Sequence, residues 1–498
     1  MSERFTAPQD DALYLQMCAE IEEKLRRAAP LYTRRYPHVS TLPAEGLRYT
    51  PEENNIWTSS FHPGMMCLAA KRTGDAAFLK YKNDYIASFK ARLDERVGIS
   101  HDLGFLYTLS AVALYKLTGD EEARALALRA ADMLCERYNE KGRYIQAWGE
   151  FNVGTPYVKI IVDTMLNLPL LFWASETTGN ARYADIATAH AHTCADYLVR
   201  EDYSSFHTYL MDPATGKAVE GRTHQGFHDN TTWARGQAWV VTGFALAYTY
   251  TKEPRFLEVS RKAAEVFLQN LPADFVPYWD FTFNDHIPDI RDSSAASIFT
   301  CGLLELAQYA DNAEAARDRA AARTIVRSLY DHYFLHDPDR AGVLTDAIYH
   351  RDTGATCVIW GDYFFYETLL RLLGGHGLGA AFFARLLYGL LAGLFRLGTL
   401  LFDHVLSVLI LQLEHQPQHE HEHHDRKAEP APELELEERL DRPVLCLHAK
   451  EAEKDRDRER RAEEQHPQHR LDGATLTHTQ VRDQKQQTQQ KKRRELRK

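Results

Sequence analysis

Two aspartates stand where a carboxyl group could carry out acid–base chemistry. Asp163 follows the apolar run YVKIIV at 157–162, so its carboxyl group is expected in a dry setting. Desolvation raises a carboxyl pKa and produces a usable general acid near neutral pH, although a helix N-terminus would oppose that rise. Asp102, in SHDLGFLY, is a candidate partner, because two carboxylates in one cleft push their pKa values apart. Each aspartate could equally be an ordinary helix cap.

Aromatic and polar residues that could hold a sugar ring accompany these aspartates. Flat apolar faces come from Trp148, Trp233 and Trp239, although a single tryptophan belongs more often to a core. Arg235 lies in the otherwise apolar segment WARGQAW and needs an anionic partner. That partner is either a structural ion pair or a substrate carboxylate. His207 and Gln225 are further candidates, with ordinary hydrogen-bonded side chains as the alternative.

Composition excludes several other functions. The 498 residues include 59 basic and 70 acidic side chains, a net charge of −11, which argues against a nucleic-acid partner. Seven cysteines are scattered without a CxxC pair, so we expect buried, reduced thiols and no disulfide scaffold, zinc ribbon or thioredoxin-type redox site. Residues 1–16 lack the apolar stretch of a secretory signal, which predicts a cytoplasmic protein.

The chain divides into three parts by composition. All seven tryptophans lie in residues 1–373, which we interpret as one globular catalytic domain. Residues 374–413 are rich in Leu, Gly, Ala and Phe, and 414–498 form a charged, low-complexity tail that we expect to be disordered. Arg385, Arg396 and Asp403 interrupt the apolar part. An amphipathic helix is therefore favoured over a membrane span, and membrane association through 377–413 is the less favoured alternative.

The globular part has a repeating helical pattern. The junctions KRTGDAAFLKY, KLTGDEEARAL and ETTGNARYADI each fit one helix ending at glycine and another beginning just after it. Segments before the junctions are apolar all round, whereas those after them are amphipathic, which indicates inner and outer helices. Six inner helices are predicted to begin near 57, 102, 163, 229, 292 and 362. We therefore predict an all-α fold, an (α/α)6 barrel of six helical hairpins, although an open solenoid would give a similar pattern.

Four motifs in this order resemble a known enzyme family. They are IIVDTMLNLPLLFWASETTG, THQGFHDNTTWARGQAW, DSSAASIF and WGDYFFYETLLRL. Residues from about 45 to 373 resemble the unsaturated glucuronyl hydrolases of glycoside hydrolase family 88. The resemblance implies an (α/α)6 barrel that removes 4,5-unsaturated glucuronic acid from the non-reducing end of lyase-generated oligosaccharides. Water adds across the C4=C5 vinyl ether and the hemiketal then opens, without a metal or cofactor.

The resemblance also implies roles for particular residues. Asp163 would protonate C4 and help deliver water to C5, and Asp102 would hold the sugar hydroxyls. The implied sugar-binding positions are Trp148, His207, Gln225, Arg235 and Trp239, with Trp57 and Phe61 as further aromatic walls. We expect Arg235 to meet the uronate carboxylate.

Two alternative functions remain open from the sequence. An unsaturated rhamnogalacturonyl hydrolase would share the fold and the hydration chemistry but act on pectin-derived substrates. A non-catalytic α/α barrel could bind sugar or protein without turning it over. This chain also departs from the family by continuing for about 125 residues beyond the last matching helix.

Overall fold

The computed structural model describes residues 4–42, 46–151 and 156–374. The apolar segment 374–413 and the tail 414–498, apart from Gly374, lie outside these described residues. Within them helices dominate, as predicted. The inner helices are α2 (Phe61–Thr73), α4 (Leu103–Tyr107) continuing into α5 (Ala113–Thr118), α7 (Pro169–Thr178), α9 (Ala234–Thr251), α11 (Ser293–Leu306) and α13 (Ile359–Gly374). The outer helices are α1 (Asp11–Ala28), α3 (Lys82–Asp94), α6 (Glu121–Cys135), α8 (Ala181–Tyr197), α10 (Pro254–Gln269) and α12 (Asn312–Tyr333).

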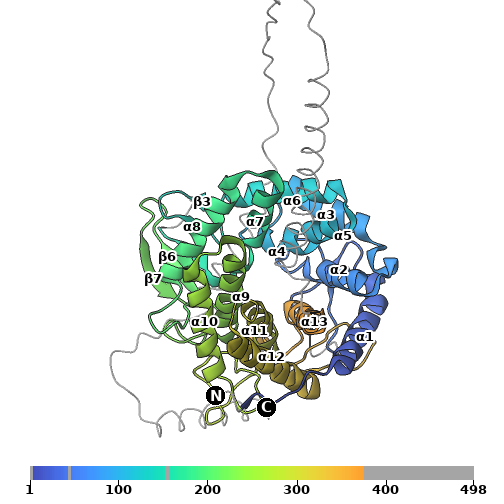
Figure 1. Cartoon of the computed structure of the whole chain (residues 1–498). Coiled ribbons are helices and arrows are strands. Elements are labelled where there is room, and N and C mark those ends of the chain that lie inside the picture. The colour runs from blue at the N-terminus through green and yellow to red at the C-terminus, as the bar shows by residue number, and fades with distance from the viewer. Residues whose placement is uncertain (1–3, 43–45, 152–155, 375–498) are drawn as a thin grey trace, which may run out of the picture. The chain divides into compact units, whose positions relative to one another are not determined.

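The inner helices form a closed ring, so the described part is a barrel and not an open solenoid. Helix α9 packs on α11, α11 on α13, and α13 on α2. The ring continues through the α4–α5 segment and α7 back to α9, as Figure 1 shows along the barrel axis. Helix α13 also packs on α1, which ties the two ends of the described chain together.

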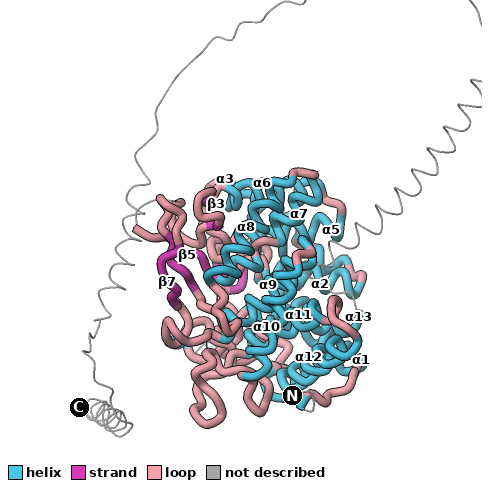
Figure 2. The backbone as a smooth tube through the Cα atoms, turned by 60° about the vertical axis from the view of Figure 1, so that its left-hand side comes forward, coloured by secondary structure: helices cyan, strands magenta, loops and turns pink. Residues whose placement is uncertain are grey.

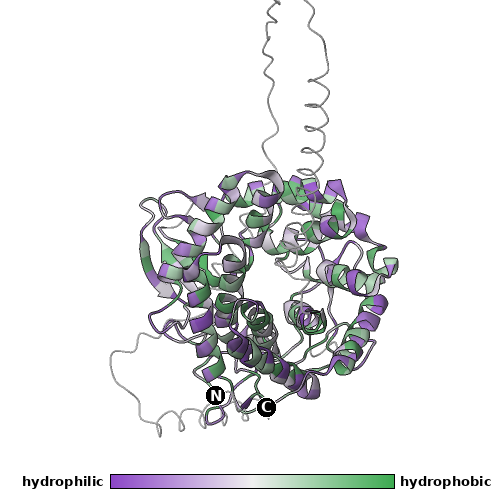
Figure 3. Ribbon diagram, viewed as in Figure 1, coloured by the Kyte–Doolittle hydropathy of each residue, from purple (hydrophilic) through white to green (hydrophobic). Residues whose placement is uncertain are grey.

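The inner and outer helices differ in how much of their surface is buried, as the pattern predicts. Every residue of α11 is buried, whereas α10 buries one face that includes Phe256, Val259, Ala263 and Phe267. In Figure 3 the hydrophilic colour is concentrated on the outer helices, at the outside of the ring. Burial of these faces, at about 25 cal/mol per Å² of apolar surface, is the main stabilising term.

The predicted junctions are confirmed in their local geometry. Helix α5 ends at Thr118, and Gly119 adopts the left-handed conformation (φ 72°) that glycine takes without strain. The next residue, Asp120, accepts main-chain hydrogen bonds from Glu122 and Ala123 and caps α6. This tight connection turns the chain back and makes each pair of helices a hairpin.

A small sheet that was not predicted lies beside the barrel and positions the candidate acid. Strand β5 (Val158–Ile161) pairs antiparallel with β6 (Thr208–Met211), which pairs with β7 (Ala218–Arg222). Figure 2 shows these strands together at one side of the helices. The apolar run before Asp163 is therefore a strand, consistent with its Val and Ile content.

Three predicted inner-helix starts are wrong by four to six residues, and the first of them, near 57, moves to Phe61. Asp163 lies in the 3-10 helix η6 (Val162–Leu166), and α7 begins at Pro169, a residue favoured in the first helical turn. The inner helix predicted to begin near 229 is α9, which begins at Ala234. Between these strands and helices the chain forms irregular segments that carry the site.

Two further features of the described residues concern thiols and membranes. Six cysteines in the described part are free, and five of them are buried, as predicted. No helix within 4–374, as far as the structure describes it, is long and apolar enough to cross a bilayer.

Candidate active site

The five aspartates at the predicted inner-helix starts differ in what their side chains bind. Asp292 accepts two main-chain hydrogen bonds in the first turn of α11 and is a true cap. Asp362 accepts the Tyr49 hydroxyl at 2.8 Å, and Asp229 pairs with Arg222 at 2.8 Å. These three carboxylates are held by the fold itself.

The other two, Asp102 and Asp163, cap no helix. Asp102 immediately precedes α4, and its Oδ2 accepts the Ser100 hydroxyl at 2.8 Å. Asp163 Oδ2 has no hydrogen-bond partner among the described residues, although the side chain is only 16% exposed. An unpaired buried oxygen is costly, so a position of this kind suggests a ligand or a catalytic role.

Asp163 has the electrostatic setting of a general acid. Burial raises the pKa of its carboxyl group to about 7, and the charge of Asp102 adds to that rise. The positive charge of Arg235 and the indole N–H of Trp239 oppose it. A carboxyl group with a pKa near 7 is protonated often enough to donate a proton at neutral pH and can then act as the base.

His207 presents a fixed donor to this carboxyl group. Its Nδ1 accepts the main-chain N–H groups of His224 and Gln225, both at 3.1 Å. Because Nδ1 is an acceptor, the neutral ring carries its proton on Nε2, which lies 3.8 Å from Asp163 Oδ2. Burial first, and then the nearby positive groups, lower the pKa of His207 well below its usual range, so the ring stays neutral.

His101 belongs to the same region and was not predicted. Its Nε2 lies 3.4 Å from Asp102 Oδ1, and its Nδ1 is 2.8 Å from the Thr164 hydroxyl, one residue after Asp163. Burial lowers the pKa of this imidazole as well. The only sequence signal was its position beside Asp102, which is too weak to identify a functional histidine.

Three buried polar atoms in this region lack a hydrogen-bond partner in the described structure: Asp163 Oδ2, His207 Nε2 and Trp239 Nε1. A fourth, His101 Nε2, has only Asp102 Oδ1 nearby, at 3.4 Å. Each such atom left without a partner or water costs about 1–3 kcal/mol. These atoms are concentrated beside the two aspartates, a polar cluster of the kind found at functional sites.

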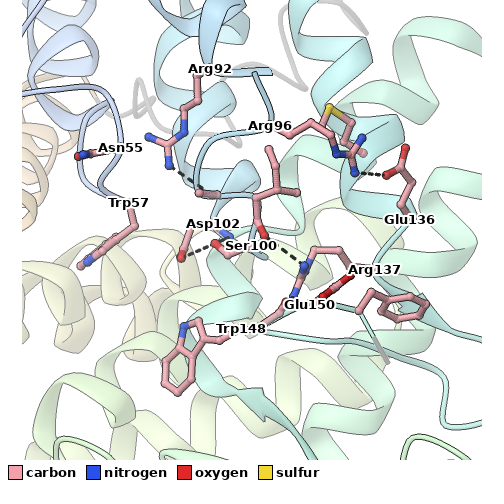
Figure 4. Close-up of a pocket in the computed structure, with 15 residues that line it drawn as sticks. Asn55, Trp57, Arg92, Arg96, Ser100, Asp102, Glu136, Arg137, Trp148 and Glu150 are labelled. Atoms are coloured by element: carbon pink, nitrogen blue, oxygen red, sulfur yellow. Dashed lines mark hydrogen bonds and ion pairs between the residues drawn. The ribbon is translucent and has the colours of Figure 1, made fainter. Parts of the chain in front are cut away.

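A cavity of about 770 Å³ opens beside Asp102 (Figure 4). Trp57 and Trp148 form two of its walls, and their flat faces are of the kind on which sugar rings stack. Phe61 is fully buried and packs edge-on against Trp57 at 5.8 Å, so it supports that wall from behind. Trp239 is also fully buried and contributes its indole N–H to the Asp163 side.

Arg235 forms the structural ion pair that was one of its two predicted roles. Its Nη1 lies 2.6 Å from Asp292 Oδ2, and the guanidinium group lies over the Trp233 ring at 4.4 Å. Its Nη2 donates to the Tyr349 carbonyl at 3.3 Å. The charge of Arg235 nevertheless acts on both Asp163 and His207, which places it next to the candidate acid.

Gln225 connects two segments of the site. Its side-chain Nε2 donates to the Tyr349 carbonyl at 2.9 Å, while its own N–H holds His207. Tyr349 was not predicted, because it follows no motif and becomes a neighbour only through the fold. Within the described residues no cluster of three or more His, Cys, Asp or Glu side chains could hold a metal ion.

Comparison with known proteins agrees with this geometry. Residues 37–388 match the sequence model of Glycosyl Hydrolase Family 88. The chain is 42% identical over 348 residues to the unsaturated glucuronyl hydrolase of Bacillus sp. (strain GL1). The aligned residues make up 68% of this chain and 92% of that protein. The chain is 40% identical over 330 residues to the unsaturated chondroitin disaccharide hydrolase of Streptococcus pneumoniae (strain ATCC BAA-255 / R6). That alignment covers 65% of this chain and 83% of the relative.

Solved structures show the same similarity in three dimensions. The crystal structure of the unsaturated glucuronyl hydrolase from Streptococcus agalactiae superposes with a TM-score of 0.72 at 33% identity, covering 75% of this chain and 96% of that one. The enzyme from Bacillus sp. GL1 gives a TM-score of 0.69 at 40% identity, covering 73% and 97%. By the family model and by these relatives, the chain belongs to glycoside hydrolase family 88.

Proposed function

We propose that this protein removes 4,5-unsaturated glucuronic acid from the non-reducing end of oligosaccharides produced by polysaccharide lyases. The observation that carries the proposal is the Asp163 carboxyl group, with its pKa raised to about 7 and its Oδ2 unpartnered opposite His207 Nε2. The similar proteins named above act on unsaturated glucuronyl or chondroitin disaccharides by name, which supports the same substrate class here.

Asp163 acts first as an acid and then as a base. Its proton goes to C4 of the C4=C5 double bond, and the positive charge that develops at C5 is stabilised by the ring oxygen. Water then attacks C5 and gives its proton to the Asp163 carboxylate, while His207 Nε2 can donate to that carboxylate or to the water. One carboxyl group suffices, so the carboxylate spacing of ordinary glycosidases does not apply.

The hydrated sugar then breaks down without further catalytic groups. The new C5 hydroxyl makes C5 a hemiketal, which opens by breaking the bond from C5 to the ring oxygen. The former ring oxygen remains on C1 as a hydroxyl group, and C1 collapses to an aldehyde as the rest of the oligosaccharide leaves. One water molecule is consumed overall.

The remaining site residues hold the sugar. Asp102 lies at the cavity beside Trp57 and Trp148, where it can accept hydrogen bonds from sugar hydroxyls between two aromatic walls. Arg235, whose Nη1 is paired with Asp292, also supplies the positive charge next to Asp163, and this charge is proposed to attract the uronate carboxylate. An Arg235→Ala substitution should therefore raise KM strongly.

The substrate class is tested by following the ultraviolet absorbance of the conjugated double bond. The full chain is given unsaturated glucuronyl disaccharides with different second sugars and, separately, an unsaturated rhamnogalacturonyl disaccharide. We expect the absorbance to fall with the glucuronyl substrates. A fall with the rhamnogalacturonyl substrate alone would identify the other hydrolase, and binding without any fall would show a non-catalytic barrel.

A further inference from the structure

Two buried arginines beside the cavity have an unusual set of partners. Arg92, on α3, and Arg137, just after α6, are each 4% exposed. Within the described part of the chain neither has a carboxylate at ion-pair distance, although buried arginines are normally paired with one, and the charge of Asp102 acts on both from farther away. Their hydrogen bonds go to main-chain carbonyls and one amide oxygen of irregular segments.

Arg92 binds two of these segments at once. Its Nη1 donates to the Asn54 amide oxygen at 3.0 Å and to the Ile56 carbonyl at 2.8 Å, directly before Trp57. Its Nε donates to the Val97 carbonyl at 3.2 Å and its Nη2 to the Gly98 carbonyl at 3.3 Å. Arg92 thus ties the Trp57 segment to the segment that leads to Asp102.

Arg137 continues the connection on the other side. Its Nη1 donates to the Ile99 carbonyl at 3.2 Å. Its Nε donates to Gln146 at 2.9 Å, and its Nη2 donates to Ala147 at 3.2 Å and to Gly149 at 2.9 Å, all through carbonyl oxygens. These last three residues surround Trp148, so Arg137 ties the Asp102 segment to the Trp148 segment (Figure 4).

Gly98 fits this arrangement. Its φ of 57° is a conformation that side chains rarely adopt, and a Cβ built there would lie 2.8 Å from Arg92 Nη2. The missing side chain therefore makes room for the guanidinium group.

We propose that Arg92 and Arg137 are positioning residues that hold the three segments carrying Trp57, Asp102 and Trp148 as one unit around the sugar-binding cavity. Planar guanidinium groups suit this task, because each offers five N–H donors in a fixed geometry to several carbonyls. Lysine keeps the charge but cannot reproduce the planar set of donors. The role in sugar binding rests on the proposed function, whereas the structural coupling of the three segments does not.

The test compares Arg92→Lys and Arg137→Lys with Lys24→Gln in the full chain. Lys24 is also a buried cation that donates to main-chain carbonyls, those of Asp337 and Arg340, in a segment that carries no candidate site residue. We expect both arginine variants to raise KM for an unsaturated glucuronyl disaccharide by about 10- to 100-fold, with a smaller change in kcat, because misplaced walls weaken binding. Lys24→Gln should lower the melting temperature and leave KM unchanged.

Amide hydrogen exchange provides a readout that does not depend on activity. Arg137→Lys should speed exchange at the hydrogen-bonded amides of His101 and Ala147 but not at Asn55. Arg92→Lys should speed amide exchange at Asn55 and Val97 but not at Ala147. If an arginine variant fails to fold, Gly98→Ala, which displaces the Arg92 guanidinium group, takes its place with the expectations for Arg92.

Unchanged KM in folded arginine variants, or exchange that rises evenly over the whole chain as in Lys24→Gln, would overturn the proposal. Absence of turnover by the unsubstituted protein on every unsaturated uronide would instead refute the proposed function. The segment-specific exchange pattern would still decide whether the arginines couple the three segments.

Discussion

Asp163 and Asp362 both have a carboxyl pKa that desolvation raises to about 7, yet their surroundings differ. Asp362 is fully buried, and its two oxygens accept the Tyr49 hydroxyl at 2.8 Å and the Leu344 N–H at 2.9 Å. Asp163 keeps 16% of its side-chain surface and leaves Oδ2 unpartnered. A raised pKa therefore does not by itself identify a catalytic acid. An unpaired oxygen on a side chain that is still partly exposed distinguishes Asp163.

The largest expected effect is a loss of kcat that follows substitution of Asp163 but not of Asp362. Asp163→Asn should lower kcat by about 10²–10⁴-fold, the usual contribution of a general acid–base group, because an amide cannot donate the proton. Binding of the disaccharide, followed by tryptophan fluorescence, should persist. The matched Asp362→Asn variant should keep its kcat. Equal losses in the two variants would remove the distinction between them.

The opposite effect is expected in stability. Asp362→Ala leaves the Leu344 N–H and the Tyr49 hydroxyl buried without an acceptor, which should cost about 2–4 kcal/mol of unfolding free energy. Urea denaturation measures this loss. Activity per folded molecule should not change, and a large fall in kcat at full folding would contradict the structural role of Asp362.

A pair of histidine substitutions examines the donor that faces Asp163. His207→Asn keeps an oxygen near the Nδ1 position to accept the His224 and Gln225 N–H groups but loses the Nε2 donor. His207→Gln places an N–H group near Nε2 but loses the inner acceptor. We expect His207→Asn to reduce kcat by about 10- to 100-fold and His207→Gln to reduce kcat less. A larger loss with Gln than with Asn would show that the ring matters only for holding the 224–225 segment.

The last expected effect concerns the dependence of stability on pH. The folded pKa of Asp163, about 7, lies above its usual value of 3.8, so the folded state holds a proton that the unfolded state releases between these values. This carboxyl group therefore destabilises the protein increasingly as pH rises through that window, and the penalty is complete above about pH 7. Relative to the parent protein, Asp163→Asn should gain about 3–4 kcal/mol of unfolding free energy between pH 4 and pH 8, at about 1.4 kcal/mol for each unit of pKa shift. A constant difference between variant and parent would argue against the raised pKa.

The sequence was sufficient to predict the helical rings because their signals are local. The apolar and amphipathic segments and the glycine junctions depend on residues within one or two turns, and Gly119 and Asp120 take the predicted cap positions. The sheet before Asp163 escaped prediction, because a six-residue apolar run fits a strand and a buried helix equally well.

The site was predicted less completely because its contacts span long distances along the chain. Asp163 and His207 meet because β5 and β6 pair side by side, a register that neither segment specifies alone. Asp292, the partner of Arg235, lies 57 residues away, and no local pattern distinguishes it from a substrate carboxylate. His101 had no signal beyond its position beside Asp102.

The dependence of kcat/KM on pH tests the central claim most directly. If Asp163 donates the proton, kcat/KM of the full chain should fall above a pKa of about 7, and Asp362→Asn should show the same limb because that carboxyl group takes no part in the reaction. The measurement runs from about pH 5 to about pH 9 at constant ionic strength, with folding checked at each point. A rate per folded molecule that stays constant across the alkaline half of this range would contradict the assignment of Asp163 as the acid.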